Sequence, residues 1–268
     1  MFNQLRMDLY RMKKSKSVYV CFLCMLGVIF LSYVMAYLLA TPNGQQTALK
    51  LGMLTLSELD MGKTYLEGID LLGMFREANM DGGMYSLIFG IAVTLLVSGD
   101  YQGGFIKNIL PLHRERWTYV GSKLIASGIL NFLYLTAGFA FNALVNLLFH
   151  NLVPLSDWKG TLFYLGWVWV VTMGFAALII MLCVLSRNVT IGVLGAVLGG
   201  SGIIVTLLSG ITQQFHLSGW EEYTLYFNLT YGPSAYTSAG DLRGVAVGLV
   251  FLAVYTAAAM ITVMKRDV

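Results

Sequence analysis

Six apolar runs constrain the fold of this chain more than any other feature, because each is about long enough to cross a bilayer as a helix. A transmembrane helix needs roughly 20 mostly apolar residues, with a lower limit of about 17. The runs lack the strict alternation of membrane β-barrel strands. The sequence therefore predicts an all-α integral membrane fold with six transmembrane helices. The predicted spans are residues 18–40, 82–98, 123–149, 160–185, 189–209 and 244–264.

The composition excludes a water-soluble domain of this size. Of the 268 residues, 57% are hydrophobic and 12% are charged, whereas soluble domains contain about 25% charged residues. Too little polar surface is present to cover a soluble fold, so most of the apolar surface must face lipid or other membrane helices. No linker and no clear internal repeat divides the chain, which indicates one membrane domain over residues 1–268.

The distribution of charges predicts which side of the membrane each end faces. An even number of spans places both termini on one side, together with residues 99–123 and 186–188. That side carries twelve Lys and Arg residues and four acids, whereas the other carries five Lys and Arg residues and ten acids. Because basic residues concentrate in cytoplasmic segments, we expect both termini in the cytoplasm and the protein in the cytoplasmic membrane. The net charge of +3 thus reflects topology and gives no indication of nucleic-acid binding.

The first 17 residues form a basic segment with an apolar stripe. Phe2, Leu5, Leu9 and Met12 recur at helical spacing, and most of the basic residues lie off this stripe. A helix of this kind lies along the membrane surface with its apolar face in the headgroup region. The alternative is a plain cluster of positive charges that anchors the first span.

Two long segments are predicted on the external side. Residues 41–81 are acidic and carry apolar residues at three- and four-residue steps, which favours partial helix. Residues 210–243 mix aromatic, Gly, Pro and acidic residues, a composition that suits interfacial or re-entrant segments at headgroup level. We therefore expect an external loop after the first span and a re-entrant region before the last.

The third span carries a polar face. Asn131, Asn142 and Asn146 lie within about 60° of one another on a helix with 100° per residue, and Tyr134 lies in the same span. Uncompensated amides are costly in hydrocarbon, so this face should meet protein or a water-accessible cavity. Two interpretations are open: hydrogen bonds between helices, or the lining of a translocation path.

Small residues in the fifth span predict close helix packing. Gly195 and Gly199 are four residues apart, as are Ala196 and Gly200. Such pairs let two helix backbones approach closely, here within the chain or across a dimer. A phosphate-binding loop is excluded, since these glycines lie in an apolar span without a following Lys-Ser or Lys-Thr pair.

The sequence contains no catalytic or metal-binding motif. The three histidines are isolated from one another, and neither a nucleophile elbow nor a Walker sequence for ATP is present. The three cysteines fall inside predicted spans, where packing is the ordinary role and nothing implies a disulfide framework. Charged residues within the spans are essentially missing, which argues against an ion-coupled carrier. We therefore expect no enzymatic activity, no metal site and no cofactor in this chain.

Residues 99–116 combine positive charge with a small apolar face. Apolar residues at positions i, i+1, i+4 and i+5 predict a short helix, and two preceding glycines permit a sharp turn. An apolar centre within a polar rim is typical of a protein-docking patch; the alternative is a helix resting on the inner leaflet. The apolar face comprises Phe105, Ile106, Ile109 and Leu110, and the rim comprises Asp100, Lys107 and Asn108.

This stretch also carries a resemblance. The sequence DYQGGFIKNIL at residues 100–110, followed by Arg116 and by SKLI at 122–125, resembles the signature of ABC-2-type permeases of ATP-binding cassette transporters. The basic N-terminal segment, the six spans, the external loop and the re-entrant region extend the resemblance over nearly the whole chain. Three positions depart from the family pattern: Asp100 replaces a Glu, Phe105 a Thr and Pro111 a Ser, and the proline should end the short helix early.

The resemblance implies that residues 99–116 contain the coupling helix that docks into a groove on a separate ATP-binding cassette ATPase. It also implies a second permease copy, identical or different, and places ATP and Mg²⁺ on the ATPase. The residues to which it assigns docking are Asp100, Tyr101, Gly104, Phe105, Ile106, Lys107, Asn108 and Arg116.

The function implied is that of a permease subunit of a bacterial exporter. It would translocate or extract an amphipathic substrate such as an antimicrobial peptide, a lipid or a hydrophobic drug, and the lack of charge within the spans fits such a cargo. The alternative from another class is a membrane sensor or scaffold. It would bind an external ligand through residues 41–81 and signal to a cytoplasmic regulator.

Overall fold

The computed structural model describes residues 2–53, 55, 62, 64, 66, 68–104, 117–215 and 219–265. Within these ranges every regular element is helical, in agreement with the all-α prediction. The long helices are α2 (Lys16–Ala40), α6 (Met84–Gln102), α8 (Trp117–Leu148), α9 (Trp158–Ser186) and α13 (Arg243–Lys265). The shorter ones are α1 (Phe2–Lys14), α3 (Pro42–Lys50), α5 (Leu71–Asn79), α10 (Val189–Gly200), α11 (Ile203–Gln214) and α12 (Leu225–Tyr231), with single turns at Asp81–Gly83, Trp220–Tyr223 and Ala239–Leu242.

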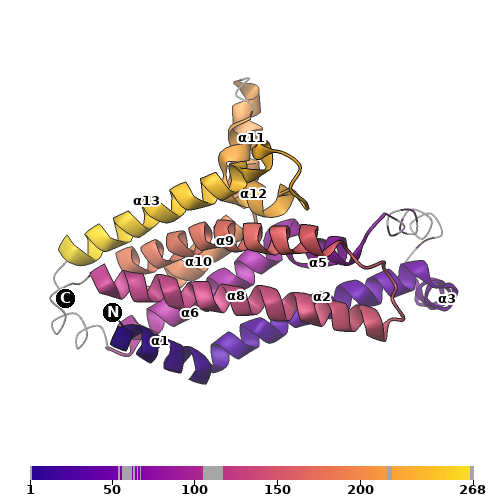
Figure 1. The fold of residues 1–268 in the computed structure, drawn as a ribbon, viewed down its shortest axis with the longest axis horizontal. Coiled ribbons are helices and arrows are strands. Elements are labelled where there is room, and N and C mark those ends of the chain that lie inside the picture. Colours follow the sequence, from indigo (N-terminus) through magenta and orange to yellow (C-terminus); the bar gives the residue numbers. More distant parts are fainter. Residues whose placement is uncertain are drawn as a thin grey trace.

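Helix α9 forms the centre of the bundle. It packs against α13, α8, α6 and α10, and α2 joins the opposite flank through α6 and α8 (Figure 1). Its inward side chains, such as Tyr164, Val168 and Ala176, are fully buried. The nearly uniform apolar composition predicted for this segment thus reflects contact with other helices on several sides.

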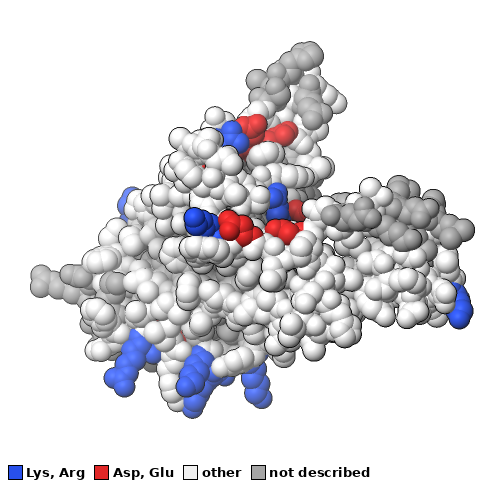
Figure 2. Space-filling view, turned by 45° about the vertical axis from the view of Figure 1, so that its right-hand side comes forward, with Lys and Arg blue, Asp and Glu red and all other residues white. Residues whose placement is uncertain are grey.

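The two ends of the bundle differ in what they carry. Helix α1 and the C-terminal end of α13 lie at one end, whereas α3 lies at the other (Figure 1). The end of α6 and the start of α8 contact α1 and so lie at the first end. In Figure 2, Lys and Arg side chains project along the lower edge of the molecule, where α1 and the start of α2 lie. The side of the membrane that each end faces stays a prediction from the charge distribution.

Five helices in the described residues are long and apolar enough to cross a membrane. They are the five long helices, and their bounds differ from the predicted spans by a few residues, most at the start of the third span, which begins at Trp117 instead of residue 123. A sixth crossing exists only if α10 and α11 together count as one span, since they meet at 54°. The span predicted over residues 189–209 thus falls on a bent pair of helices, and its crossing of the membrane stays a prediction.

The bend has a local cause at Gly202. This residue has a φ of 72°, in the left-handed region that interrupts a helix and that glycine adopts at little cost. Before the bend, α10 packs closely on α6 and α9. After it, α11 projects from the bundle (Figure 1) and leaves large apolar side chains uncovered, including Leu207 and Ile211.

The predicted glycine positions make close contacts within the chain. A Cβ on Gly195 would collide with the Leu182 side chain, and one on Gly199 would come within 3.0 Å of the Phe175 ring, so both pack onto α9. A Cβ on Gly200 would lie 2.9 Å from the backbone nitrogen of Leu87 on α6. A second close crossing, not anticipated from the sequence, joins α9 to α13 at Gly174 and Gly248.

The N-terminal helix differs from expectation in the face that it turns inward. The sequence predicted an apolar stripe, yet the buried residues of α1 are Gln4, Asp8 and Met12, and Phe2 is 86% exposed. Two of the three buried side chains are thus polar. The inward face is selected by the partners that α6 and α8 offer, which sequence periodicity does not reveal.

Candidate functional site

The predicted docking segment is described at its two ends. Residues 105–116, with Phe105, Ile106, Lys107, Asn108 and Arg116, lie outside the described residues. The described chain reaches Gly104, which follows the end of α6, and resumes at Trp117 with α8. The docking role of the intervening segment stays a prediction, and the structure places the groups that hold its two ends.

A buried lysine joins two carboxylates at this end of the bundle. The Lys123 ammonium, on the second turn of α8, lies 2.6 Å from Asp8 Oδ1 on α1 and 2.6 Å from Asp100 Oδ2 on α6. The three side chains are only 1–2% exposed. Charge-assisted hydrogen bonds of this length are among the stronger polar contacts in proteins. One cation therefore links three helices.

Further groups complete the hydrogen bonding of both carboxylates. Arg11 on α1 forms an ion pair with the other oxygen of Asp100, and the Tyr119 hydroxyl donates to Asp100 Oδ2 over 3.2 Å. The Ser122 hydroxyl donates to Asp8 Oδ2 over 3.0 Å. We call these six residues the ion cluster: Asp8, Arg11, Asp100, Tyr119, Ser122 and Lys123.

The ion cluster is electrically balanced, with two cations and two carboxylates. Balance matters because an unpaired ion in a dry environment costs several kcal/mol. Since the interactions lie at 1–2% exposure for three of the four charges, water and salt screen them little. Removing one member would leave its partner charged and buried, so the cluster acts as a unit.

The ion cluster lies where α6 ends and α8 begins. Asp100 lies two residues before the end of α6, and Tyr119, Ser122 and Lys123 lie in the first turns of α8. The cluster therefore joins the end of α6 to the start of α8, and joins both to α1.

The structure changes the role of the first predicted docking residues. Asp100 is 0% exposed, so it does not form part of an exposed polar rim as the sequence suggested. Its carboxylate forms ion pairs with Lys123 and Arg11 inside the bundle. Tyr101 is half-buried, and Gly104 has a φ of 68°, which permits a sharp turn directly after α6.

Several members of the ion cluster were not recognised in the sequence. Asp8 and Arg11 were treated as charges of a surface helix, and Lys123 was counted with the cytoplasmic loop. A signal was present, because Asp8 is the one acid among five basic residues in the first 17 positions. Sequence spacing could not show that residues more than 100 positions apart meet.

The polar face of α8 is buried against other helices of the chain. Asn131 accepts from the Tyr85 hydroxyl over 2.6 Å and donates to the Trp169 carbonyl over 3.1 Å. The Tyr134 hydroxyl donates to the Val18 carbonyl over 2.5 Å. All four predicted residues of this face are at most 3% exposed. Of the two interpretations left open, hydrogen bonding between elements matches the contacts in this chain, and the path lining stays a prediction.

The remaining two asparagines anchor loops to α8. Asn142 donates to the Leu71 carbonyl at the start of α5 over 2.9 Å. Asn146 forms two bonds with the backbone of Val153, donating over 3.0 Å and accepting over 3.1 Å. Asn146 thereby satisfies both backbone groups of Val153, which is buried. Their role is to hold α5 and the α8–α9 connection in place.

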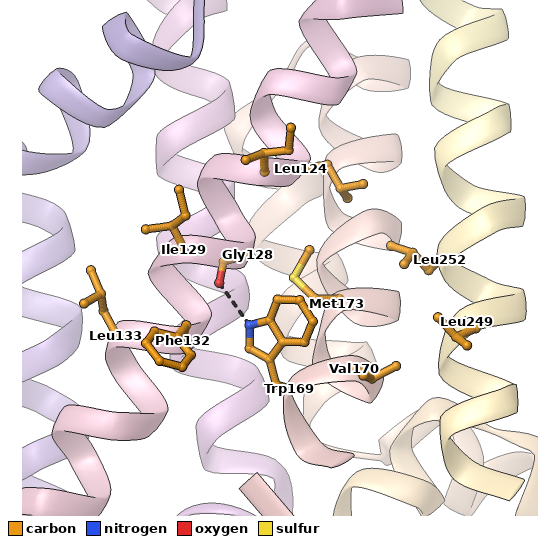
Figure 3. A pocket seen from close by; sticks show the side chains of 11 residues that line it. Leu124, Gly128, Ile129, Phe132, Leu133, Trp169, Val170, Met173, Leu249 and Leu252 are labelled. Carbon is orange, nitrogen blue, oxygen red and sulfur yellow. Dashed lines mark hydrogen bonds between the residues drawn. The ribbon is translucent and has the colours of Figure 1, made fainter. Parts of the chain in front are cut away.

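An apolar groove opens between α8, α9 and α13 (Figure 3). It has a volume of about 530 Å³, and the Trp169 ring crosses from α9 to α8, where its Nε1 donates to the Gly128 carbonyl over 3.0 Å. Leucines of α13, including Leu249 and Leu252, line the opposite wall. The groove can accommodate an apolar chain or side chain and offers almost no hydrogen-bonding group.

The fold and the ion cluster define a class of protein: a multi-pass helical membrane protein with a braced segment between its second and third spans. The chain belongs to the ABC-2 family of transporter proteins, whose family model matches residues 5–202. A search of curated proteins finds no match. ABC-2 permeases are membrane components of transporters, and the family implies an ATP-binding cassette ATPase as partner. The matched range contains the whole ion cluster and the apolar groove apart from its α13 wall.

Proposed function

We propose that this protein is the permease subunit of an ABC exporter in which residues 99–116 dock a separate ATPase. The observation that carries the proposal is the ion cluster, because it braces both ends of that segment against α1. Only 12% of the residues are charged, yet this cluster buries several of them, and burying ions is costly unless they are paired. A balanced cluster at this position is well suited to transmit a movement of the ATPase into the bundle.

The cargo that we propose is amphipathic, such as an antimicrobial peptide, a lipid or a hydrophobic drug. The polar face of α8 is occupied by internal hydrogen bonds, so a single chain offers a strongly polar solute no obvious path. The apolar groove between α8, α9 and α13 could receive the apolar part of an amphipathic molecule. A second permease copy would complete the path. Outward transport across the cytoplasmic membrane remains part of the proposal.

The experiment that tests docking introduces charge into the proposed apolar face. Phe105→Asp combined with Ile106→Asp should abolish co-purification with the ATPase and reduce cargo-stimulated ATP hydrolysis at least tenfold, because carboxylates in an apolar interface are desolvated without partners. Leu51→Asp is the matched control, since Leu51 is an exposed apolar residue next to α3 at the other end of the bundle.

Normal coupling in the double variant would refute the docking assignment. Stoichiometric recovery of a regulator instead of an ATPase would favour the sensor or scaffold alternative. The cargo class is tested separately by survival of cells that express the wild-type chain with its ATPase. Protection against an amphipathic peptide but not against a small hydrophilic antibiotic supports an amphipathic cargo.

A further inference from the structure

A second apolar groove lies where α1 turns into α2. It has a volume of about 440 Å³, within the range of roughly 300–1,000 Å³ that is common for small-molecule sites. Leu9 and Met12 of α1, Val18 and Phe22 of α2, and Leu133 and Ala137 of α8 line it. Figure 1 shows α1 and α2 meeting in a V at the edge of the bundle. The groove is therefore at the end of the molecule that carries the ion cluster.

The walls of this groove expose almost no unsatisfied polar group. The Tyr134 hydroxyl donates to the Val18 carbonyl over 2.5 Å, and the Tyr19 hydroxyl donates to the Lys13 carbonyl over 2.9 Å. Both tyrosines line the groove and have used their hydroxyls on backbone groups at the bend. The interior of the groove is thus suited to hydrocarbon, and a hydrogen-bonding ligand would find few partners in it.

The rim of the groove is basic. Lys13 lines the groove, and Arg6 lies seven residues earlier on α1, about 20° away on the same helix face. Lys16 lies directly after the bend, and Arg6, Lys13 and Lys16 are all exposed. None of these three forms an ion pair with an acidic side chain of the described residues. Lys14 belongs to a separate pocket beside Asp100. Figure 2 shows basic side chains projecting at this edge.

We propose that this groove binds one anionic phospholipid, with an acyl chain between α1, α2 and α8 and its phosphate at Lys13 and the neighbouring cations. A single molecule then satisfies both features, an apolar slot and a positive rim, and basic clusters next to a membrane helix attract anionic lipids. The proposal depends on membrane insertion but not on the cargo or on ATPase docking. Bound lipid would hold α1 against α8 and so stabilise the contact between these helices at which the ion cluster forms.

A second copy of the chain fits this site poorly. A symmetric contact through the bend would bring Lys13 and the neighbouring exposed cations of each copy together. Like charges placed opposite each other at an interface are unfavourable, and no acidic residue of the described chain lines the groove to compensate them. Charge complementarity therefore favours an anionic lipid over self-association.

Native mass spectrometry of the detergent-purified chain tests the proposal. The probes are phosphatidylglycerol and phosphatidylcholine with identical acyl chains. We expect the first phosphatidylglycerol adduct to be at least fivefold more abundant than the phosphatidylcholine adduct. Lys13→Gln with Lys16→Gln should remove this preference, whereas Lys50→Gln, at an exposed lysine of α3, should keep it.

The acyl slot is tested by filling it. Ala137→Trp should reduce adducts of both lipids at least threefold, because the indole occupies the space of the chain. Leu133→Gln is the second variant, since Leu133 is 49% exposed and its substitution leaves the buried core intact. Circular dichroism and the elution volume of each variant check the fold.

Five results would overturn the proposal. The first three are equal binding of the two lipids by the wild-type chain, loss of preference in Lys50→Gln, and unchanged adducts in both folded groove variants. The fourth is full displacement of phosphatidylglycerol by glycerol phosphate, which would indicate a site for free phosphate. The fifth is the finding of dimers that exclude the lipid while monomers retain it, which would assign the groove to a second copy.

Discussion

Two regions of this protein use ion pairs in opposite ways. At the end of the bundle that carries α1, Lys123 joins Asp8 and Asp100 at 1–2% exposure, with Arg11 completing the charge balance. At the start of α13, Arg243 pairs with Glu222 while both side chains are more than 40% exposed. The guanidinium also lies 5.8 Å from the centre of the Tyr223 ring. The buried pairs join three helices, whereas the exposed pair joins the single turn at Trp220–Tyr223 to the start of α13.

The difference shows which charged residues contribute most to the stability of this protein. An exposed pair is screened and contributes about 0–1 kcal/mol. Breaking a buried pair by removing one partner costs about 3–5 kcal/mol, because the remaining charge is left without compensation. The end with the buried cluster is also the end that brackets the proposed docking segment. The proposed docking role and the buried ion pairs therefore lie at the same end.

The largest effect is expected from Lys123→Met. The change leaves Asp8 and Asp100 buried with only Arg11 to balance them, and we expect a loss of about 3–5 kcal/mol in the free energy of unfolding. Thermal unfolding in detergent, followed by the monodisperse peak that survives heating, measures it. Lys123→Met combined with Asp8→Asn restores charge balance around Arg11 and Asp100 and should recover part of the loss. A double variant less stable than the single one would show that charge balance does not determine how much the cluster stabilises the fold.

An intermediate effect is expected from Asp8→Asn alone. Lys123 keeps Asp100 as a partner, and the amide oxygen can still accept from Ser122, so the expected cost is about 1–3 kcal/mol. The same heating assay measures it. Because α1 loses its ionic tie to α8, transport should fall more than ATPase binding does. Equal loss of both would mean that α1 serves folding and has no separate part in transmission.

The smallest effect is expected from Arg243→Gln, at most about 1 kcal/mol. Salt sharpens the contrast, because exposed pairs are screened over about 10 Å at 0.1 M ionic strength, and buried pairs much less. Raising the salt concentration should erase the difference between Arg243→Gln and the wild type while leaving the defect of Lys123→Met. A salt-resistant defect in Arg243→Gln would contradict the assignment of this pair to the solvated surface.

Much of the fold could be predicted from apolar length alone. Five of the six predicted spans correspond to long helices, because a run of apolar residues has few alternatives to a helix in lipid. The run at residues 189–209 is helical, but the sequence did not predict that it bends. Hydropathy does not distinguish a straight helix from a broken one, and the left-handed Gly202 is one glycine among 29.

The candidate site was predicted only in part. The pattern of residues 99–116 singled out the segment between the second and third spans, and Asp100 and Tyr101 were assigned to it. The inward direction of Asp100 was not, because its partner Arg11 lies 89 positions away along the chain. The polar face of α8 shows the same limit: the sequence required partners for its asparagines without naming them.

The sequence by itself determined the membrane class, the approximate spans and the family, because these follow from local properties such as apolar length, charge distribution and a contiguous motif. Only the tertiary structure decided which charges are buried together, which face of α1 turns inward, and where α11 leaves the bundle. Those outcomes depend on side chains that are distant in sequence but satisfy one another in space. A buried ion is stable only beside its counter-ion, and that pairing exists only in the folded chain.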